Sequence, residues 1–244
     1  ARILAAVEGV LGRTAWDEAW AHALNPHAVY GHVGEILRPE FRARQWRLAD
    51  CERQTLVYTN AGHPRRGTET LLPAAALLRP EFPRLRLRLA GVVSERSGYG
   101  RFLRRRIRDL RLTDCVEFTG YLDAAAMAGE LLRAHLFVIS SYVENSPNSL
   151  AEAMLVGMPC VASYVGGIPS MVDDGRTGLL YPVDDIPLLA SRIRLLLRDD
   201  ATAASLGQAA RAVALQRHDP GRIADELLAA YARVLAATGA GAGS

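Results

Sequence analysis

Residues 136–181 read LFVISSYVENSPNSLAEAMLVGMPCVASYVGGIPSMVDDGRTGLLY, and this stretch decides how the rest of the chain is interpreted. An apolar run, Leu136–Ile139, ends in two serines and is followed by a short loop that carries Glu144. Ser146 is a favourable helix N-cap, and Pro147 suits the first helical turn. The stretch therefore predicts a buried strand, a loop and a helix in succession.

The predicted helix begins where the strand ends, so it presents the free N–H groups of Asn148, Ser149 and Leu150 at the carboxyl edge of a sheet. Such a helix N-terminus binds anions and suits a diphosphate. Glu144 lies just before this end and Glu152 lies one turn inside it. Carboxylates repel phosphates but accept hydroxyl donors well, so the pair points to one sugar on each side of a diphosphate, as in a nucleotide sugar. Alone, either glutamate has the plainer interpretation of a solvated surface residue.

From residue 50 onward, short apolar or β-branched runs alternate with longer helical stretches, which predicts βαβ units and a parallel sheet. The expected fold class is α/β, with a Rossmann-like doubly wound parallel sheet. The expected strands are 55–59, 85–90, 115–118, 136–140, 160–163 and 178–181. The expected helices are 67–79, 100–110, 123–133, 148–157, 167–173, 185–198, 202–214 and 221–237. The first ~45 residues do not show the alternation; there we expect a helix at 13–20, a short strand at 28–31 and an extended link at 36–41.

The composition of the 244-residue chain excludes several classes of function. All 29 basic residues are arginine, so mechanisms that need a lysine are excluded, and a net charge of +3 is too small for a dedicated nucleic-acid binder. Three cysteines, odd in number and far apart, provide no zinc or disulfide framework, which favours a reducing, cytoplasmic location. No apolar run of about 18 residues predicts a transmembrane helix.

The order of motifs resembles a known family. The spacing E-x7-E from Glu144 to Glu152, followed by EAMLVGMPCVAS, a Gly-Gly pair and DGRTGLLYPVDD, resembles the C-terminal domain of family 4 retaining glycosyltransferases of the GT-B fold, over about residues 54–235. In that family the first glutamate contacts the donor sugar and the second contacts the nucleotide ribose. The variant ENSPNSLAEAM resembles members that build bacterial exopolysaccharide or capsule.

The resemblance implies a reaction and its partners. The enzyme would transfer a sugar from a nucleoside diphosphate sugar to a hydroxyl of a glycan or lipid-linked acceptor, with retention of configuration. Neither a metal ion nor another cofactor is implied, and Glu144 would orient the sugar without acting as a nucleophile. The aspartate pairs at 173–174, 184–185 and 199–200 fit turn and cap positions better than metal ligation.

A basic loop completes the family pattern in altered form. The family carries a basic pair that ends in Lys-Gly, and the matching stretch here, residues 60–67, reads NAGHPRRG. Arg66 stands at the lysine position, where we expect it to grip the diphosphate. The family's earlier arginine falls near Ala61 and is absent, so His63 or Arg65 would have to substitute for it. The plainer interpretation of both is a solvated loop residue.

Three further residues are candidates for donor binding. The resemblance places Tyr121, in the loop TGYL, against the nucleotide base. Gly91 would let the backbone approach the ligand, and Gly167 would do so beside the donor sugar. Simple packing, a turn glycine and the start of a short helix are the respective alternatives. Residues 101–111 predict an amphipathic basic helix packed on the sheet, which could also make peripheral contact with the inner face of a membrane.

The expected organisation has three parts: residues 1–48 as the tail of a missing N-terminal acceptor domain plus a hinge, 49–216 as the nucleotide-sugar-binding domain, and 217–244 as a crossing helix with a flexible tail. A GT-B cleft lies between two domains, so we expect this chain to bind donor weakly and to transfer little sugar alone. The alternatives are a GT-B relative with other chemistry, such as a sugar-nucleotide epimerase or a phosphorylase, or a non-catalytic nucleotide-sugar binding module. A pyridoxal-type phosphorylase would need the lysine that the chain lacks.

Overall fold

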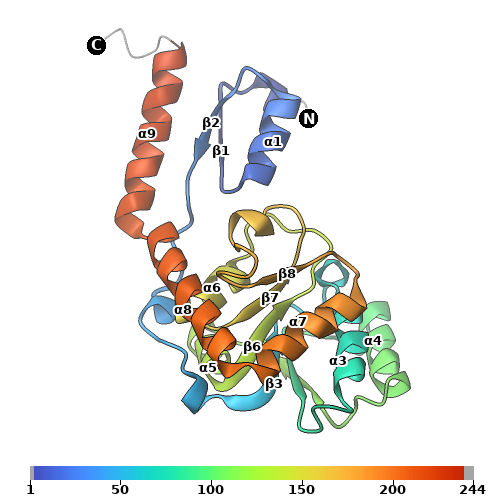
Figure 1. Cartoon of the computed structure of the whole chain (residues 1–244). Coiled ribbons are helices and arrows are strands. Elements are labelled where there is room, and N and C mark those ends of the chain that lie inside the picture. The colour runs from blue at the N-terminus through green and yellow to red at the C-terminus, as the bar shows by residue number, and fades with distance from the viewer. Residues whose placement is uncertain (1–2, 239–244) are drawn as a thin grey trace.

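A computed structural model describes residues 3–238, which form a large unit and a smaller one above it (Figure 1). The large unit is a parallel sheet of six strands in the order β5-β4-β3-β6-β7-β8. These strands are β3 Glu52–Tyr58, β4 Arg86–Ala90, β5 Val116–Gly120, β6 Ala134–Ile139, β7 Cys160–Ser163 and β8 Leu179–Tyr181. The smaller unit is the parallel pair β1 Gly9–Gly12 and β2 Val29–His32, with α1 Ala15–Leu24 between them.

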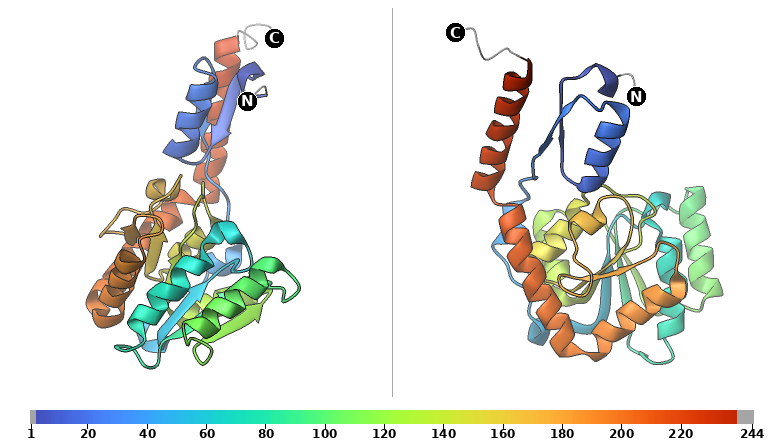
Figure 2. Two further views of the ribbon diagram at one scale, coloured as in Figure 1. Left: turned by 90° about the vertical axis from the view of Figure 1, so that its right-hand side faces the viewer. Right: turned by 45° about the horizontal axis from the view of Figure 1, so that its top comes forward.

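Helices cover both faces of the large sheet (Figure 2). The remaining helices are α2 Pro39–Arg42, α3 Thr68–Leu78, α4 Gly98–Asp109, α5 Ala124–Arg133, α6 Asn148–Val156, α7 Ile186–Arg198, α8 Asp200–Arg217 and α9 Pro220–Thr238, with single 3₁₀ turns at Leu4–Ala6, Leu48–Asp50, Pro64–Arg66 and Ile168–Ser170. Two hydrophobic cores result, one on each face, because successive side chains of a strand point to opposite sides. Along β6, Leu136 and Val138 pack into one core, and Phe137 and Ile139 pack into the other.

The strand order fixes where a ligand can bind. The chain enters the sheet at its centre with β3, builds outward to β5, then returns to the centre with β6 and builds outward to β8. This doubly wound order confirms the predicted α/β fold class. The loops that leave β3 and β6 diverge to opposite faces, so a crevice opens between them at the carboxyl ends of the strands.

The structure confirms all six predicted strands of the large sheet and corrects the prediction for the N-terminal residues. Those residues do alternate, because β1, α1 and β2 form a parallel βαβ unit of their own. The strand β1 reads GVLG, which is too short and too rich in glycine to give a period-two signal. The smaller unit is thus built by the same rule as the large one.

Two other predicted segments were wrong in detail. The link at 36–41 is not wholly extended, since Pro39 starts the one-turn helix α2, in which Phe41 is fully buried. The helix expected at 167–173 is only the 3₁₀ turn Ile168–Ser170. The glycine pair before it and Pro169 inside it do not support a longer helix.

The ends of the described chain meet in the smaller unit, where α9 lies beside β2 (Figures 1 and 2). Ala230 of α9 is buried in this contact. The tail predicted at 240–244 lies outside the described residues. Within residues 3–238, no helix combines the length and the apolarity needed to cross a membrane. On α4, Leu103 and Ile107 are buried as an amphipathic helix requires, whereas Phe102 is exposed and stacks on Tyr99.

A prediction about stability concerns Gly67, which joins the turn Pro64–Arg66 to α3. Its φ is +72°, and a Cβ there would lie 2.0 Å from the carbonyl oxygen of Ser140. We expect Gly67→Ala to lower the free energy of unfolding by about 2–4 kcal/mol, because it combines a left-handed backbone with a backbone clash. The measurement is equilibrium denaturation in urea.

Gly129 provides the matched control, since it lies inside α5 with nothing within 4 Å of a Cβ. We expect Gly129→Ala to raise the stability by about 0.5–1 kcal/mol, as removal of a glycine from a helix does. Equal effects of the two substitutions would contradict this account of the loop.

Candidate functional site

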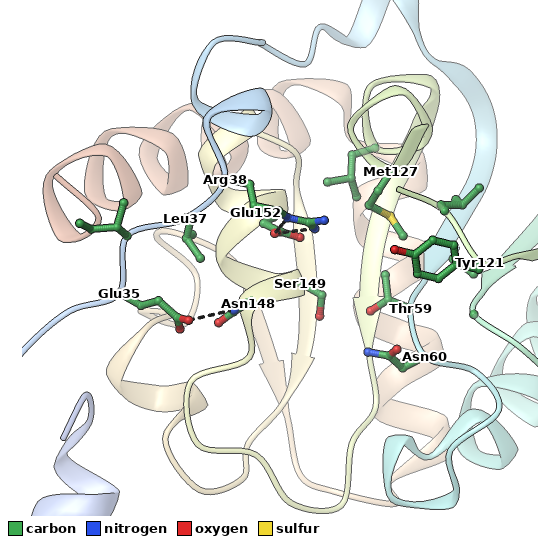
Figure 3. Close-up of a pocket in the computed structure, with 15 residues that line it drawn as sticks. Glu35, Leu37, Arg38, Thr59, Asn60, Tyr121, Met127, Asn148, Ser149 and Glu152 are labelled. Carbon is green, nitrogen blue, oxygen red and sulfur yellow. Dashed lines mark hydrogen bonds and ion pairs between the residues drawn. The ribbon is translucent and has the colours of Figure 1, made fainter. Parts of the chain in front are cut away.

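Two cavities lie side by side at the carboxyl edge of the sheet, and Asn60 lines both of them. The first, about 420 Å³, is lined by Glu152 together with residues 35–38, the ends of β3 and β4, and the loop after β5; we call it the Glu152 cavity. Figure 3 shows its lining. The second, about 410 Å³, is lined by Glu144 and residues of the basic loop 60–67; we call it the Glu144 cavity. Both open at the crevice that the strand order predicts.

The N-terminus of α6 borders the Glu152 cavity. The N-cap is Pro147, which has no side chain able to cap, and not Ser146 as predicted. The Ser146 hydroxyl is turned instead toward the sulfur of Met171, at 3.7 Å. As N-cap, Ser146 would have bonded the amide of Asn148 or Ser149. Within residues 3–238 neither of these amides has a hydrogen-bond partner, so both are open to a ligand.

The third predicted amide is not free. The N–H of Leu150 donates to the carbonyl of Pro147 at 3.0 Å, and the Leu150 side chain is fully buried in the core. The helix therefore offers two amides to an anion, both from its first turn. The positive end of the helix dipole lies at the same place and adds to their attraction for negative charge.

Glu152 lies inside α6, largely buried, with its carboxylate facing the cavity (Figure 3). Its Oε1 accepts hydrogen bonds from Nε and Nη2 of Arg38, at 2.9 and 2.7 Å. Burial raises the pKa of the Glu152 carboxyl, and the Arg38 guanidinium partly offsets this rise. The two residues are 114 positions apart, so Arg38 connects the segment between the two units to the site.

Glu144 is held in the loop after β6. Its Oε1 accepts hydrogen bonds from Ser141 Oγ at 2.9 Å and from Nη1 of Arg66. The loop itself rests on the glycine pair, because a Cβ on Gly166 or Gly167 would lie 1.9 or 2.2 Å from the carbonyl oxygens of Glu144 and Asn145. Gly167 lines neither cavity, and its amide donates to the Glu144 carbonyl at 3.0 Å. The close approach that the glycine pair permits is therefore to the protein's own backbone.

The basic loop after β3 brings three predicted residues together. His63, Arg65 and Arg66 all line the Glu144 cavity. Arg66 is half-buried, and desolvation lowers the pKa of its guanidinium. Asn60, at φ +56°, turns the chain from β3 into this loop. Ala61, where the family's missing arginine would fall, is fully buried, so nothing at that position reaches the cavities.

The two remaining candidates belong to the other cavity. Gly91 and Tyr121 line the Glu152 cavity, where Tyr121 is 81% exposed. The sequence did not single out Arg38, Asn60 or Glu35 as site residues. Asn60 could have been found, since it follows a buried strand directly. Arg38 and Glu35, whose carboxylate accepts from Asn148 Nδ2 at 3.2 Å, reach the site only through the fold.

Residues 41–213 match the sequence profile of the family "Glycosyl transferases group 1". This chain belongs to that family. A curated relative, the D-inositol 3-phosphate glycosyltransferase of Pseudarthrobacter chlorophenolicus, is 33% identical over 175 residues, which cover 70% of this chain and 41% of the relative. The chain therefore spans less than half the length of this relative.

Solved structures agree on the fold. Sucrose-phosphate synthase from Thermosynechococcus elongatus superimposes with a TM-score of 0.80 at 26% identity, covering 97% of this chain and 60% of that one. Anabaena HepE, solved with UDP and glucose, gives 0.78 at 22% identity, covering 93% of this chain and 63% of that one. The parallel sheet of six strands is thus the fold of GT-B glycosyltransferases. Among residues 3–238, no group of three or more potential ligand side chains could hold a metal ion.

The raised pKa of Glu152 predicts a pH effect on stability. The folded protein binds the proton of Glu152 more tightly than the unfolded chain does. This carboxyl therefore makes folding less favourable as the pH rises from the unfolded pKa of about 4.3 through the raised pKa of the folded state. We expect Glu152→Gln to be more stable than the unmodified chain at pH 7 and equal to it below about pH 4. Urea denaturation across this pH range measures the difference.

Glu52 is the control with the opposite sign, because its hydrogen bond with Arg133 lowers its pKa. Glu52→Gln should lower the stability at pH 7, by an amount that shrinks as the pH falls. A Glu152→Gln variant less stable than the unmodified chain at pH 7 would show that Arg38 outweighs the cost of burial.

Proposed function

We propose that this chain is the donor-binding half of a family 4 retaining glycosyltransferase, which transfers a sugar from a nucleoside diphosphate sugar to a hydroxyl of a glycan or lipid-linked acceptor. One observation carries the proposal. The amides of Asn148 and Ser149, which have no partner among residues 3–238, lie at the Glu152 cavity, and the Glu144 cavity adjoins that cavity at Asn60. These three neighbouring places can receive the nucleoside, the diphosphate and the sugar of such a donor.

The nucleoside occupies the Glu152 cavity. The ribose hydroxyls donate to Glu152, whose Oε2 takes no part in the hydrogen bonds from Arg38. The base lies toward Tyr121 and Gly91, in a cavity formed partly by backbone. The diphosphate meets the amides of Asn148 and Ser149, and the transferred sugar enters the Glu144 cavity.

Charge explains the chemistry at the diphosphate. Cleavage of the sugar–phosphate bond leaves negative charge on the β-phosphate, and groups that stabilise it most in the transition state accelerate the reaction. The open amides, the helix dipole, Arg65 and Arg66 supply positive charge, a role for which no metal ion is required. When the donor binds, Arg66 leaves its ion pair with Glu144 and pairs with the phosphate instead.

Once Arg66 has left it, the Glu144 carboxylate accepts hydrogen bonds from hydroxyls of the transferred sugar. In the proposed retaining reaction the acceptor oxygen attacks C1 from the face that the phosphate leaves, and its proton passes to a leaving phosphate oxygen. No covalent intermediate with Glu144 is needed. The relatives described above are named as a glycosyltransferase and a synthase, which favours sugar transfer over an epimerase or a non-catalytic module.

The acceptor binds a further domain in the proposed whole protein, and the two units here supply part of the cleft. We propose peripheral contact with the inner face of a membrane through the exposed arginines of α4, whose other face is buried on the sheet. The resemblance of ENSPNSLAEAM favours a product that is a bacterial polysaccharide.

A thermal-shift panel tests donor binding by this chain. UDP-glucose, GDP-mannose and ADP-glucose are compared with buffer alone. A donor present at about 100 times its Kd adds about 2.7 kcal/mol of stability and raises Tm by about 5–10 °C. We expect one of them to do so, and Glu152→Ala and Arg66→Ala to abolish most of the shift.

Glu95→Ala is the matched control, because Glu95 is exposed, pairs with Arg104 and lines neither cavity. It should retain the full shift. The proposed function fails if none of the three donors moves Tm, or if the site variants respond as the control does.

A further inference from the structure

One wall of the Glu144 cavity comes from the smaller unit. Trp16, in the first turn of α1, lines this cavity together with Glu144 and Arg66 of the large unit. Its side chain is about one-third exposed, and the ion pair of Glu144 and Arg66 lines the same cavity from the large unit. The cavity therefore has an aromatic wall from the smaller unit and hydrogen-bonding groups from the large unit.

The indole is presented by a helix end that is fixed to the Glu144 loop. Asn145 accepts a hydrogen bond from Thr14 Oγ1 at 2.5 Å through its Oδ1 and donates to Asp17 Oδ2 at 2.7 Å through its Nδ2. The amide of Ala15 donates to Ser170 Oγ at 3.1 Å. The Trp16 ring also meets Trp20 edge-on, with ring centroids 6.4 Å apart and planes at 75°. Contacts on both sides of Trp16 in the sequence thus hold α1 against the residue next to Glu144.

A sugar ring matches these two walls. A pyranose has a face of C–H groups that packs on an aromatic plane and a rim of hydroxyls that need polar partners. We infer that Trp16 is the stacking platform for the transferred sugar of the donor, with Glu144 receiving its hydroxyls from the other side. This inference rests on the proposed function. It means that the smaller unit takes part in recognition of the donor sugar, whereas the nucleotide binds the large unit and the segment that joins the two units.

The test separates the sugar from the nucleotide. Calorimetric titration measures the affinity for UDP-glucose, GDP-mannose or ADP-glucose, whichever binds, and for the matching nucleoside diphosphate. We expect Trp16→Ala to weaken binding of the nucleotide sugar about tenfold and to leave binding of the nucleoside diphosphate unchanged. Trp16→Phe, which keeps an aromatic face, should retain most of the affinity.

Leu24→Ala is the matched control, because Leu24 lies at the far end of the same helix, is exposed to the same extent as Trp16, and lines neither cavity. It should bind both ligands as the unmodified chain does. Tryptophan fluorescence gives a second readout if Trp16→Ala fails to fold. A nucleotide sugar should change the emission of the unmodified chain more than the nucleoside diphosphate does, and Trp16→Phe should lose this difference.

Each other outcome overturns the inference. Unchanged affinity of Trp16→Ala for the nucleotide sugar, with binding intact, removes the platform and leaves the proposed function standing. Equal losses of affinity for the nucleotide sugar and the nucleoside diphosphate mean that Trp16 stabilises the fold or contacts the nucleotide. Absence of binding to every ligand by the unmodified chain removes the proposed function and the platform together.

Discussion

Two backbone amides at the start of α6 have no acceptor within the described part of the chain, and the rest of the site is arranged around them. The fold places them there, since β6 re-enters the sheet beside β3 and the helix that follows β6 begins at the reversal point. Pro147 then starts the helix without a capping side chain. A serine cap would have satisfied one amide internally and reduced the attraction for an anion.

Glu152 and Glu144 are both paired with arginine, and the two ion pairs have different effects on the site. Glu152 is buried within α6, and its raised pKa reflects the unfavourable burial of its charge. Arg38 reaches it from the segment that joins the two units, so one ion pair connects that segment to the buried charge in the Glu152 cavity. Glu144 and Arg66 instead hold each other in place at the Glu144 cavity, where the proposed function gives both a part in donor binding.

Much of the fold followed from local pattern, because a strand buried on both faces shows as an apolar run, as in Leu136–Ile139. Elements with weak local signals were missed. The glycine-rich strand β1 has too few residues to show a two-residue hydrophobic period. Ser146 was the expected N-cap, but Pro147 has the extended dihedral angles of the N-cap residue and takes that position. Favourable local chemistry at one residue does not decide where a helix begins.

The candidate site divides in the same way. Residues on a single stretch of chain, such as Glu144, Asn148 and Glu152, could be grouped from their spacing. Arg38 and Trp16 could not, because Arg38 meets Glu152 across 114 residues, Trp16 shares a cavity with residues 60–66 and 143–145, and no local pattern marks either one. Gly167 was expected to let the backbone approach the donor sugar, whereas the close approach that the structure shows at residues 166–167 is to the backbone of residues 144–145.

An NMR titration of the backbone amides with a nucleoside diphosphate tests directly whether the start of α6 binds phosphate. We expect the largest downfield proton shifts at Asn148 and Ser149, whose N–H groups gain phosphate oxygens as acceptors. The amide of Ala126, which already donates to the capping Asp123 at 2.8 Å, should remain unshifted. Saturation binding that leaves the resonances of Asn148 and Ser149 in place would show that these amides do not bind the phosphates.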